Sequence, residues 1–252
     1  SHPRSTTLRV FSIASILVLS LVLSSYNVIR KNTVTFTSSD GLVITADEYI
    51  IANENPYILL FHEQESSRGE FQTIARRLCK MDYNCLAVDL RNGGNKDFVS
   101  NETVKRCRQS KCPNGVADIE SDMLAAIDFA LGRSNHPVIL LGSGANGSLS
   151  LKVASENDNV RAVVALSPGE YFLPYINIQD TITSIRKPVF ITSSLSEFSY
   201  VSELASGVDG QYMTLYEPQL GEGARGSVAL SSKNETNSEY WLALLLFFKD
   251  LV

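Results

Sequence analysis

Short apolar runs alternate with amphipathic segments from residue 33 onward, and this alternation restricts the fold more than any other feature of the sequence. A hairpin is predicted at 34–50, where two alternating runs flank the turn signal Ser39-Asp40-Gly41. The later apolar runs are typical of buried parallel strands, and most are followed by a segment with helical spacing. The pattern predicts an α/β fold with a mostly parallel sheet, an amino-terminal antiparallel hairpin and helices on both faces. The predicted strands after the hairpin are 57–63, 84–91, 136–142, 160–168, 188–194 and 211–218, and the predicted helices are 69–83, 118–131, 147–156, 196–206 and 238–252.

Two segments of this pattern carry more specific expectations. The polar stretch 92–116 is predicted to be the longest loop. The closing helix is predicted to start after an N-cap at Ser238. Its spacing places one apolar side against the domain, formed by Trp241, Leu245, Phe248 and Val252.

The run Val10–Ile29 contains no charged residue. As a helix, its twenty residues span about 30 Å, the thickness of a bilayer's hydrocarbon core. We therefore predict one transmembrane helix at about 10–29, which divides the chain into an anchor region, 1–31, and a domain, 32–252. A cleaved signal peptide is the main alternative, although the run is longer than a usual signal core and no A-x-A-like site follows it. A buried core helix is the third possibility.

Charge and cysteine content bear on partners and compartment. The net charge of −5 has the wrong sign for a nucleic-acid-binding protein. Residues 1–31 hold four cations and no acid, so the rest of the chain carries −9. Cys79 with Cys85 and Cys107 with Cys112 are candidate local disulfides, with free thiols as the alternative. Neither pair has the C-x₂-C spacing of a zinc site, and we expect no metal or cofactor. Local disulfides favour a domain outside the cytoplasm, held by an anchor whose amino terminus is inside.

Five motifs resemble those of the α/β-hydrolases, in particular dienelactone hydrolases and related esterases. They are FHEQESSRGEF, AVDLRNGG, DIESDMLAAIDFAL, LLGSGANGSLSL and GEGARGS, and the resemblance covers about residues 33–252. In that family the turn after the third strand helps to form the oxyanion hole. A G-x-S-x-G turn carries the nucleophile, and a late G-x-x-H-G motif carries the base.

The residues that the resemblance places at the catalytic positions do not fit catalysis. Gly144 stands at the nucleophile position and Arg225 at the base position, and arginine stays protonated at physiological pH. Glu197 follows the strand whose end bears the acid. A Ser–His–acid triad also requires a histidine late in the chain, whereas the three histidines are His2, His62 and His136. Gly144 is expected to adopt positive φ at the turn, and the side chain of Ser143 is expected to point away from the catalytic edge.

Several polar residues are predicted at the same edge of the sheet. His62, Glu63, Ser143 and Arg225 are candidate ligand-binding residues, and Asp89, Arg91, Glu170 and Glu197 are expected beside them in a polar network. The leading hypothesis is a catalytically inactive, membrane-anchored accessory or structural subunit that contacts other membrane-protein subunits. A second hypothesis is a module that binds a small acyl or anionic molecule through Arg225 and the helix N-terminus after Gly144. A third is a hydrolase with an unconventional nucleophile, Ser143 or Ser167.

Overall fold

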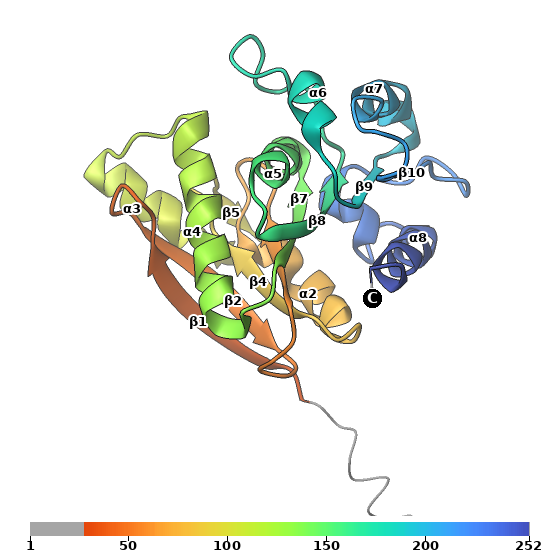
Figure 1. Cartoon of the computed structure of the whole chain (residues 1–252). Coiled ribbons are helices and arrows are strands. Elements are labelled where there is room, and N and C mark those ends of the chain that lie inside the picture. Colours follow the sequence, from red (N-terminus) through yellow and green to blue (C-terminus); the bar gives the residue numbers. More distant parts are fainter. Residues whose placement is uncertain (1–27, 252) are drawn as a thin grey trace, which may run out of the picture.

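Residues 28–251 are described by a computed structural model of the chain (Figure 1). Within this part, one eight-stranded sheet has the order β1-β2-β4-β3-β7-β8-β9-β10. The first two pairings, β1 with β2 and β2 with β4, are antiparallel, and the other pairings are parallel. The strands are β1 Arg30–Thr37, β2 Val43–Ile50, β3 Tyr57–Phe61, β4 Asn84–Val88, β7 Val138–Ser143, β8 Val160–Leu166, β9 Val189–Thr192 and β10 Met213–Tyr216.

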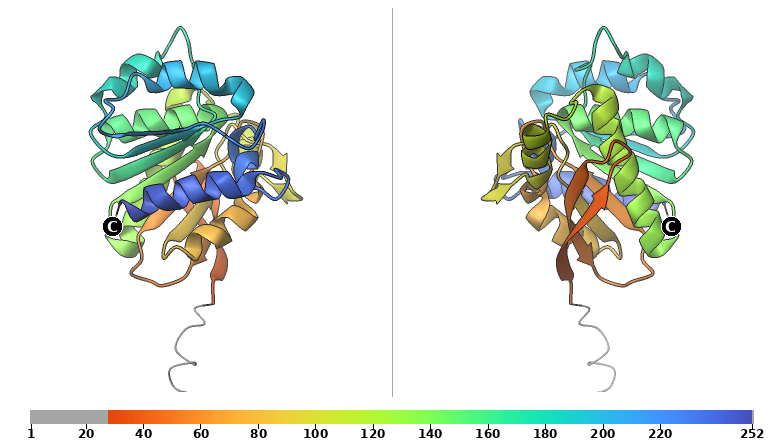
Figure 2. Two further views of the ribbon diagram at one scale, coloured as in Figure 1. Left: turned by 90° about the vertical axis from the view of Figure 1, so that its right-hand side faces the viewer. Right: turned by 90° about the vertical axis from the view of Figure 1, so that its left-hand side faces the viewer.

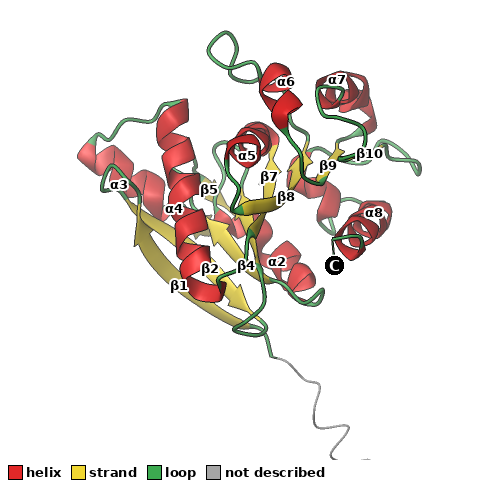
Figure 3. Cartoon of the chain, viewed as in Figure 1, coloured by secondary structure: helices red, strands yellow, loops and turns green. Residues whose placement is uncertain are grey.

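Helices cover both faces of this sheet, as Figures 2 and 3 show. Helices α3, α4, α5, α6 and α7 pack on one face, and α2 and α8 pack on the other. The predicted mostly parallel sheet with an amino-terminal hairpin and helices on both faces is confirmed. The helices are α2 Gln72–Cys79, α3 Glu102–Ser110, α4 Val116–Ser134, α5 Gly144–Glu156, α6 Ile178–Thr181, α7 Leu195–Ala205 and α8 Asn237–Lys249, and short 3₁₀ turns lie at Arg68–Phe71, Ile182–Ser184 and Gly226–Leu230.

The prediction of one long loop at 92–116 is wrong. This stretch forms the small hairpin β5 Asn95–Lys96 and β6 Val99–Ser100, followed by α3. The side chain of Asn101 caps α3 by accepting a hydrogen bond from the N–H of Val104 at 2.9 Å. Helix α3 buries few apolar side chains, so the sequence gives little helical periodicity to detect.

The expectations for the closing helix need two corrections. Thr236, not Ser238, is the N-cap of α8. Leu245 is exposed, whereas Trp241 and Phe248 are buried as predicted, and Val252 lies outside the described residues. Because α8 is apolar around its whole circumference, spacing alone could not identify which side faces the sheet.

The predicted transmembrane helix falls almost entirely on residues 1–27, which lie outside the described part of the chain. Among residues 28–251, no helix combines the length and the hydropathy needed to cross a bilayer.

Candidate functional site

The turn between β7 and α5 carries the position of the family's nucleophile. Gly144 has a φ of +58°, as the sequence predicted. This left-handed conformation strains any residue with a Cβ atom, but not glycine. The turn thus has the backbone geometry of a nucleophile elbow without a side chain at its tip.

The carboxylate of Glu63 fills the space above this turn. A Cβ atom placed on Gly144 would overlap both carboxylate oxygens of Glu63. Burial raises the pKa of the Glu63 carboxyl, while the charge of Arg225 and the backbone N–H groups of Ala145 and Gln64 lower it without cancelling the effect of burial. The N–H of the residue after the nucleophile is an oxyanion-hole donor in this fold, and here the N–H of Ala145 acts on a carboxylate of the chain itself.

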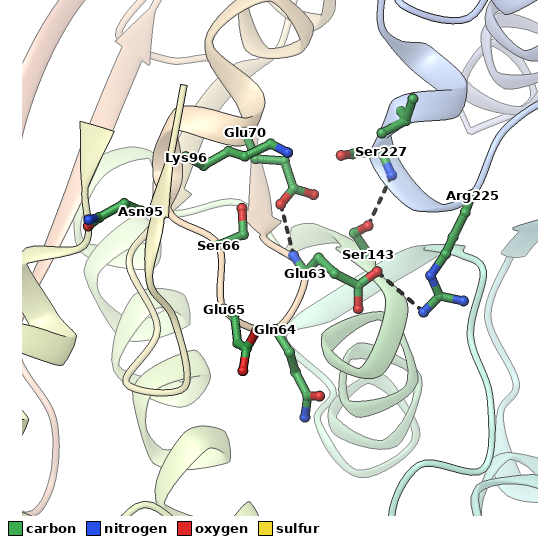
Figure 4. A pocket seen from close by; sticks show the side chains of 11 residues that line it. Glu63, Gln64, Glu65, Ser66, Glu70, Asn95, Lys96, Ser143, Arg225 and Ser227 are labelled. Atoms are coloured by element: carbon green, nitrogen blue, oxygen red, sulfur yellow. Dashed lines mark hydrogen bonds and ion pairs between the residues drawn. The ribbon is translucent and has the colours of Figure 1, made fainter. Parts of the chain in front are cut away.

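Arg225 joins the Glu63 carboxylate to the first turn of α7. Its guanidinium forms an ion pair with Glu197 and donates to the hydroxyl of Tyr171 at 2.8 Å. It also lies 3.5 Å from Oε2 of Glu63 (Figure 4). Partial burial disfavours the charge of Arg225, but Tyr171, Glu63 and Glu197 outweigh burial and raise its pKa. The guanidinium is therefore a fixed positive charge and cannot accept a proton from a nucleophile.

Ser167 and Ser143, the two alternative nucleophiles, are both buried. Ser167 has a φ of +52°, donates to Oε2 of Glu197 at 2.8 Å and accepts from the N–H of Gly226 at 2.9 Å. Ser143 accepts from the N–H of Ser227 at 3.0 Å. The expectation that Ser143 points away from the catalytic edge is wrong, because its side chain reaches the 3₁₀ turn Gly226–Leu230 and lines the pocket in Figure 4. Neither hydroxyl has a histidine as its hydrogen-bond partner.

The histidine nearest to the site has a structural role. His62 is fully buried. Its Nε2 accepts from the N–H of Leu90 at 2.9 Å, which makes Nδ1 the donor to the carbonyl oxygen of Glu63 at 2.7 Å. Nε2 therefore joins the end of β3 to the segment after β4, Nδ1 is held by the neighbouring residue, and both ring nitrogens are occupied. His136 is exposed before β7, at the opposite end of the sheet, and His2 lies outside the described residues.

Three other polar residues predicted at this edge hold loops in place. Asp89 accepts from the Arg68 side chain at 2.6 Å and from the backbone N–H groups of Arg68 and Glu102. Glu170 accepts from the first N–H groups of α6. Arg91 is fully buried and bonds to Asp122 and Asp40. The structure thus brings Glu63, Ser143, Glu197 and Arg225 together and places the others in separate networks.

A pocket of about 300 Å³ opens beside Glu63 and Arg225 (Figure 4). Its charged lining consists of Glu63, Glu65, Glu70, Lys96 and Arg225, so carboxylates outnumber cations. The backbone N–H of Glu63 donates to Oε2 of Glu70 at 3.0 Å, which fixes the Glu70 side chain beside that of Glu63. Sequence reasoning missed Glu70, which lies in the motif FHEQESSRGEF but matches no residue with a stated role, and Tyr171, which lies outside the five motifs. Within residues 28–251, no group of three or more histidine, cysteine or acidic side chains is arranged to hold a metal ion.

One of the two candidate disulfides is present. Cys107 and Cys112 are bonded and connect the end of α3 to the loop before α4. The prediction for Cys79 and Cys85 is wrong, because both are buried free cysteines. Cys79 ends α2 and Cys85 lies in β4 beneath it, and their thiols contact the backbone carbonyls of Tyr49 and Ala75 respectively.

Comparison with solved structures identifies the fold. An esterase from Pyrococcus furiosus matches over 88% of this chain and 91% of its own, with a TM-score of 0.66 at 16% identity. A putative dienelactone hydrolase from Klebsiella pneumoniae matches over 88% and 99%, with a TM-score of 0.66 at 16% identity. A dienelactone hydrolase from Anabaena variabilis matches over 87% and 98%, with a TM-score of 0.64 at 12% identity.

The chain therefore has the α/β-hydrolase fold, and its structural neighbours include esterases and dienelactone hydrolases, as the sequence motifs suggested. No protein-family model and no curated protein sequence matches the chain. At such low identity the likeness defines the fold alone, and the chemistry must be argued from the site.

Proposed function

We propose that this protein is a catalytically inactive α/β-hydrolase-fold domain, held at a membrane by residues 10–29, that serves as an accessory subunit. The observation that carries this proposal is the carboxylate of Glu63 in the space above Gly144. A nucleophile side chain would need that space, and Arg225 stands where the base would have to accept its proton. Among the described residues, the site is a half-exposed ion-pair cluster in which neither Ser143 nor Ser167 has a histidine as its hydrogen-bond partner.

The cluster stabilises the loops at the carboxyl edge of the sheet. Arg225 connects the late loop to α7 through Glu197 and to the β8–α6 loop through Tyr171. Glu197 also accepts from Ser194 at 2.9 Å and caps α7. Paired and hydrogen-bonded in this way, the charges need no ligand to compensate them. The excess of carboxylates in the pocket makes a small anion a poor ligand.

An exposed apolar loop supports the accessory role. The segment between β8 and α6 projects beyond the rest of the domain, on the side away from the start of β1 at Arg30 (Figure 1). Leu173 and Tyr175 in this loop are 54% and 90% exposed. We assign the partner contact to these side chains because they lie together in one projecting loop, and contiguous exposed apolar patches mark interaction sites. The loop lies on the far side of the domain from the proposed anchor, in a position to contact a partner that extends away from the bilayer.

Purification of the full chain in mild detergent tests this role. We expect a stoichiometric membrane-protein partner to be retained and to be lost in the variant Leu173→Ser/Tyr175→Ser. The control Leu124→Ser, an exposed leucine on α4, should retain it. A chain that purifies alone, or that keeps its partner in the loop variant, would count against the proposed role of this loop.

A further inference from the structure

Helix α8 is apolar on the side that faces solvent. No charged residue lies between Glu239 and Lys249. Leu244, Phe247 and Phe248 pack against the sheet, whereas Leu242, Leu245 and Leu246 are 59%, 45% and 55% exposed. A helix that is apolar all round is normally covered on every side. Something outside the described domain is therefore expected to cover these three leucines.

Basic side chains lie next to this leucine surface. Helix α2 runs beside α8 on the same face of the sheet (Figure 2), and the guanidinium of Arg77 stacks over the Trp241 ring at 4.2 Å. Helix α2 and its C-cap carry Arg76, Arg77 and Lys80 and no acid. We call the surface formed by Arg76, Arg77, Lys80, Leu242, Leu245, Leu246 and Lys249 the α2–α8 face. All seven of these residues are exposed.

The four cations of this face outnumber the exposed acids next to it. Asp82 and Asp250 follow the ends of the two helices. Glu239, in the first turn of α8, accepts from the Tyr216 hydroxyl and from two backbone N–H groups, so its carboxylate is turned toward the loop after β10. The α2–α8 face is thus a cationic and apolar surface on a domain whose residues after 31 carry −9.

The chain connects this face to the apolar amino-terminal run. Ile29, the last residue of that run, packs against the same core cluster as α2 and α8. The start of β1 lies next to α2, so the chain enters the domain beside this face (Figure 2). A bilayer that holds residues 10–29 would therefore lie close to the exposed leucines.

We propose that the α2–α8 face rests on an anionic lipid surface, with its leucines in the headgroup–acyl boundary and its arginines and lysines at the phosphates. Leucines flanked by cations are the side chains that bind helices to the interface of anionic membranes. Long cationic side chains can also lie along apolar surface and keep their charge at the headgroups. The proposal rests on the anchoring described above and adds a second, peripheral contact with the same membrane.

Photolabelling of the full chain in vesicles tests the contact. The vesicles contain phosphatidylcholine with phosphatidylglycerol, including a phosphatidylglycerol that bears a diazirine near its headgroup, and labelled peptides are mapped by mass spectrometry. We expect labelling of 237–249 and 72–80 about tenfold above that of α4, a ratio that corresponds to about 1.4 kcal/mol. At the same content of probe, labelling should fall when phosphatidylcholine replaces the unlabelled phosphatidylglycerol, because most of the electrostatic attraction is then lost.

Matched variants separate this contact from the anchor. Leu242→Gln/Leu246→Gln should lose most of the labelling on α8, whereas Leu124→Gln/Leu195→Gln, which removes two exposed leucines elsewhere, should not. Carbonate extraction of the same vesicles reports on the anchor. A carbonate-resistant chain with unlabelled α8, or with α8 crosslinked to a second copy, overturns the lipid contact and leaves the anchor standing. A carbonate-extractable chain with labelled α8 refutes the anchor and supports the contact, and a chain that does not bind vesicles refutes both.

Discussion

Replacement of Arg91 by methionine is expected to lower the free energy of unfolding by about 3–5 kcal/mol, the cost of breaking a buried ion pair by removing one partner. Arg91 is fully buried and bonds through Nη2 and Nε to the equally buried Asp122. Its Nη1 reaches Asp40 at 2.6 Å and the carbonyl oxygen of Pro113 at 3.0 Å. One guanidinium thus connects the β1–β2 turn, the loop after the disulfide and α4.

Equilibrium denaturation with urea at neutral pH measures this loss. The control is Arg108→Met, because Arg108 is exposed at the end of α3 and should change stability by less than about 0.5 kcal/mol. A loss below about 1 kcal/mol for Arg91→Met would show that the three segments do not depend on this residue.

Gly144→Ser is expected to destabilise the domain by about 1–3 kcal/mol, chiefly because a residue with a Cβ atom is strained at the positive φ of this turn. The serine side chain must also displace the carboxylate end of the Glu63 side chain. Glu63→Ala in the same chain should therefore restore part of the loss, a coupling that two independent sites would not show. Additive effects of the two substitutions would mean that the Glu63 side chain does not hinder a side chain at residue 144.

The Glu63 carboxyl also makes the stability of the domain depend on pH. Because burial raises its pKa in the folded state, the ionised carboxyl is less stable there than in the unfolded chain. The contribution of Glu63 to folding is therefore most favourable below the ordinary value of 4.5 and becomes less favourable as the pH rises through the raised pKa. The free energy of unfolding of Glu63→Gln, minus that of wild type, should therefore increase as the pH rises from acid to neutral. A difference that is constant with pH would contradict the raised pKa.

The sequence predicted the fold well because its signals are local. Buried strands such as Tyr57–Phe61, and the first four residues of Val138–Ser143, are uninterrupted apolar runs, and the elbow glycine is recognised by its position between such a run and a helix. The 3₁₀ turn after Arg225 and the helix α3 are held by side chains distant in sequence or by a single cap. Their signals are therefore weak in the sequence itself.

Which side chains meet at the site could be predicted only in part, because several of them come from distant segments of the chain. The motifs placed Gly144 and Arg225 at one edge of the sheet with Glu197, and in the structure Arg225 contacts Glu197. The position of the Glu63 carboxylate depends on its rotamer and on Glu70 and Arg225, which approach from other elements. Tyr171 reaches Arg225 from a loop without a motif. Such contacts follow from tertiary packing, which spacing along the chain does not record.

The central claim, that the site does not catalyse acyl transfer, is tested most directly with a fluorophosphonate probe. The probe labels a serine only when a nearby base activates it. Here the elbow residue is glycine, and the buried hydroxyls of Ser143 and Ser167 bond to a backbone N–H and to a glutamate already paired with Arg225. Intact-mass measurement of the full chain after prolonged exposure should show the unmodified mass. A single stoichiometric adduct, located on one serine and abolished by prior denaturation, would contradict the account.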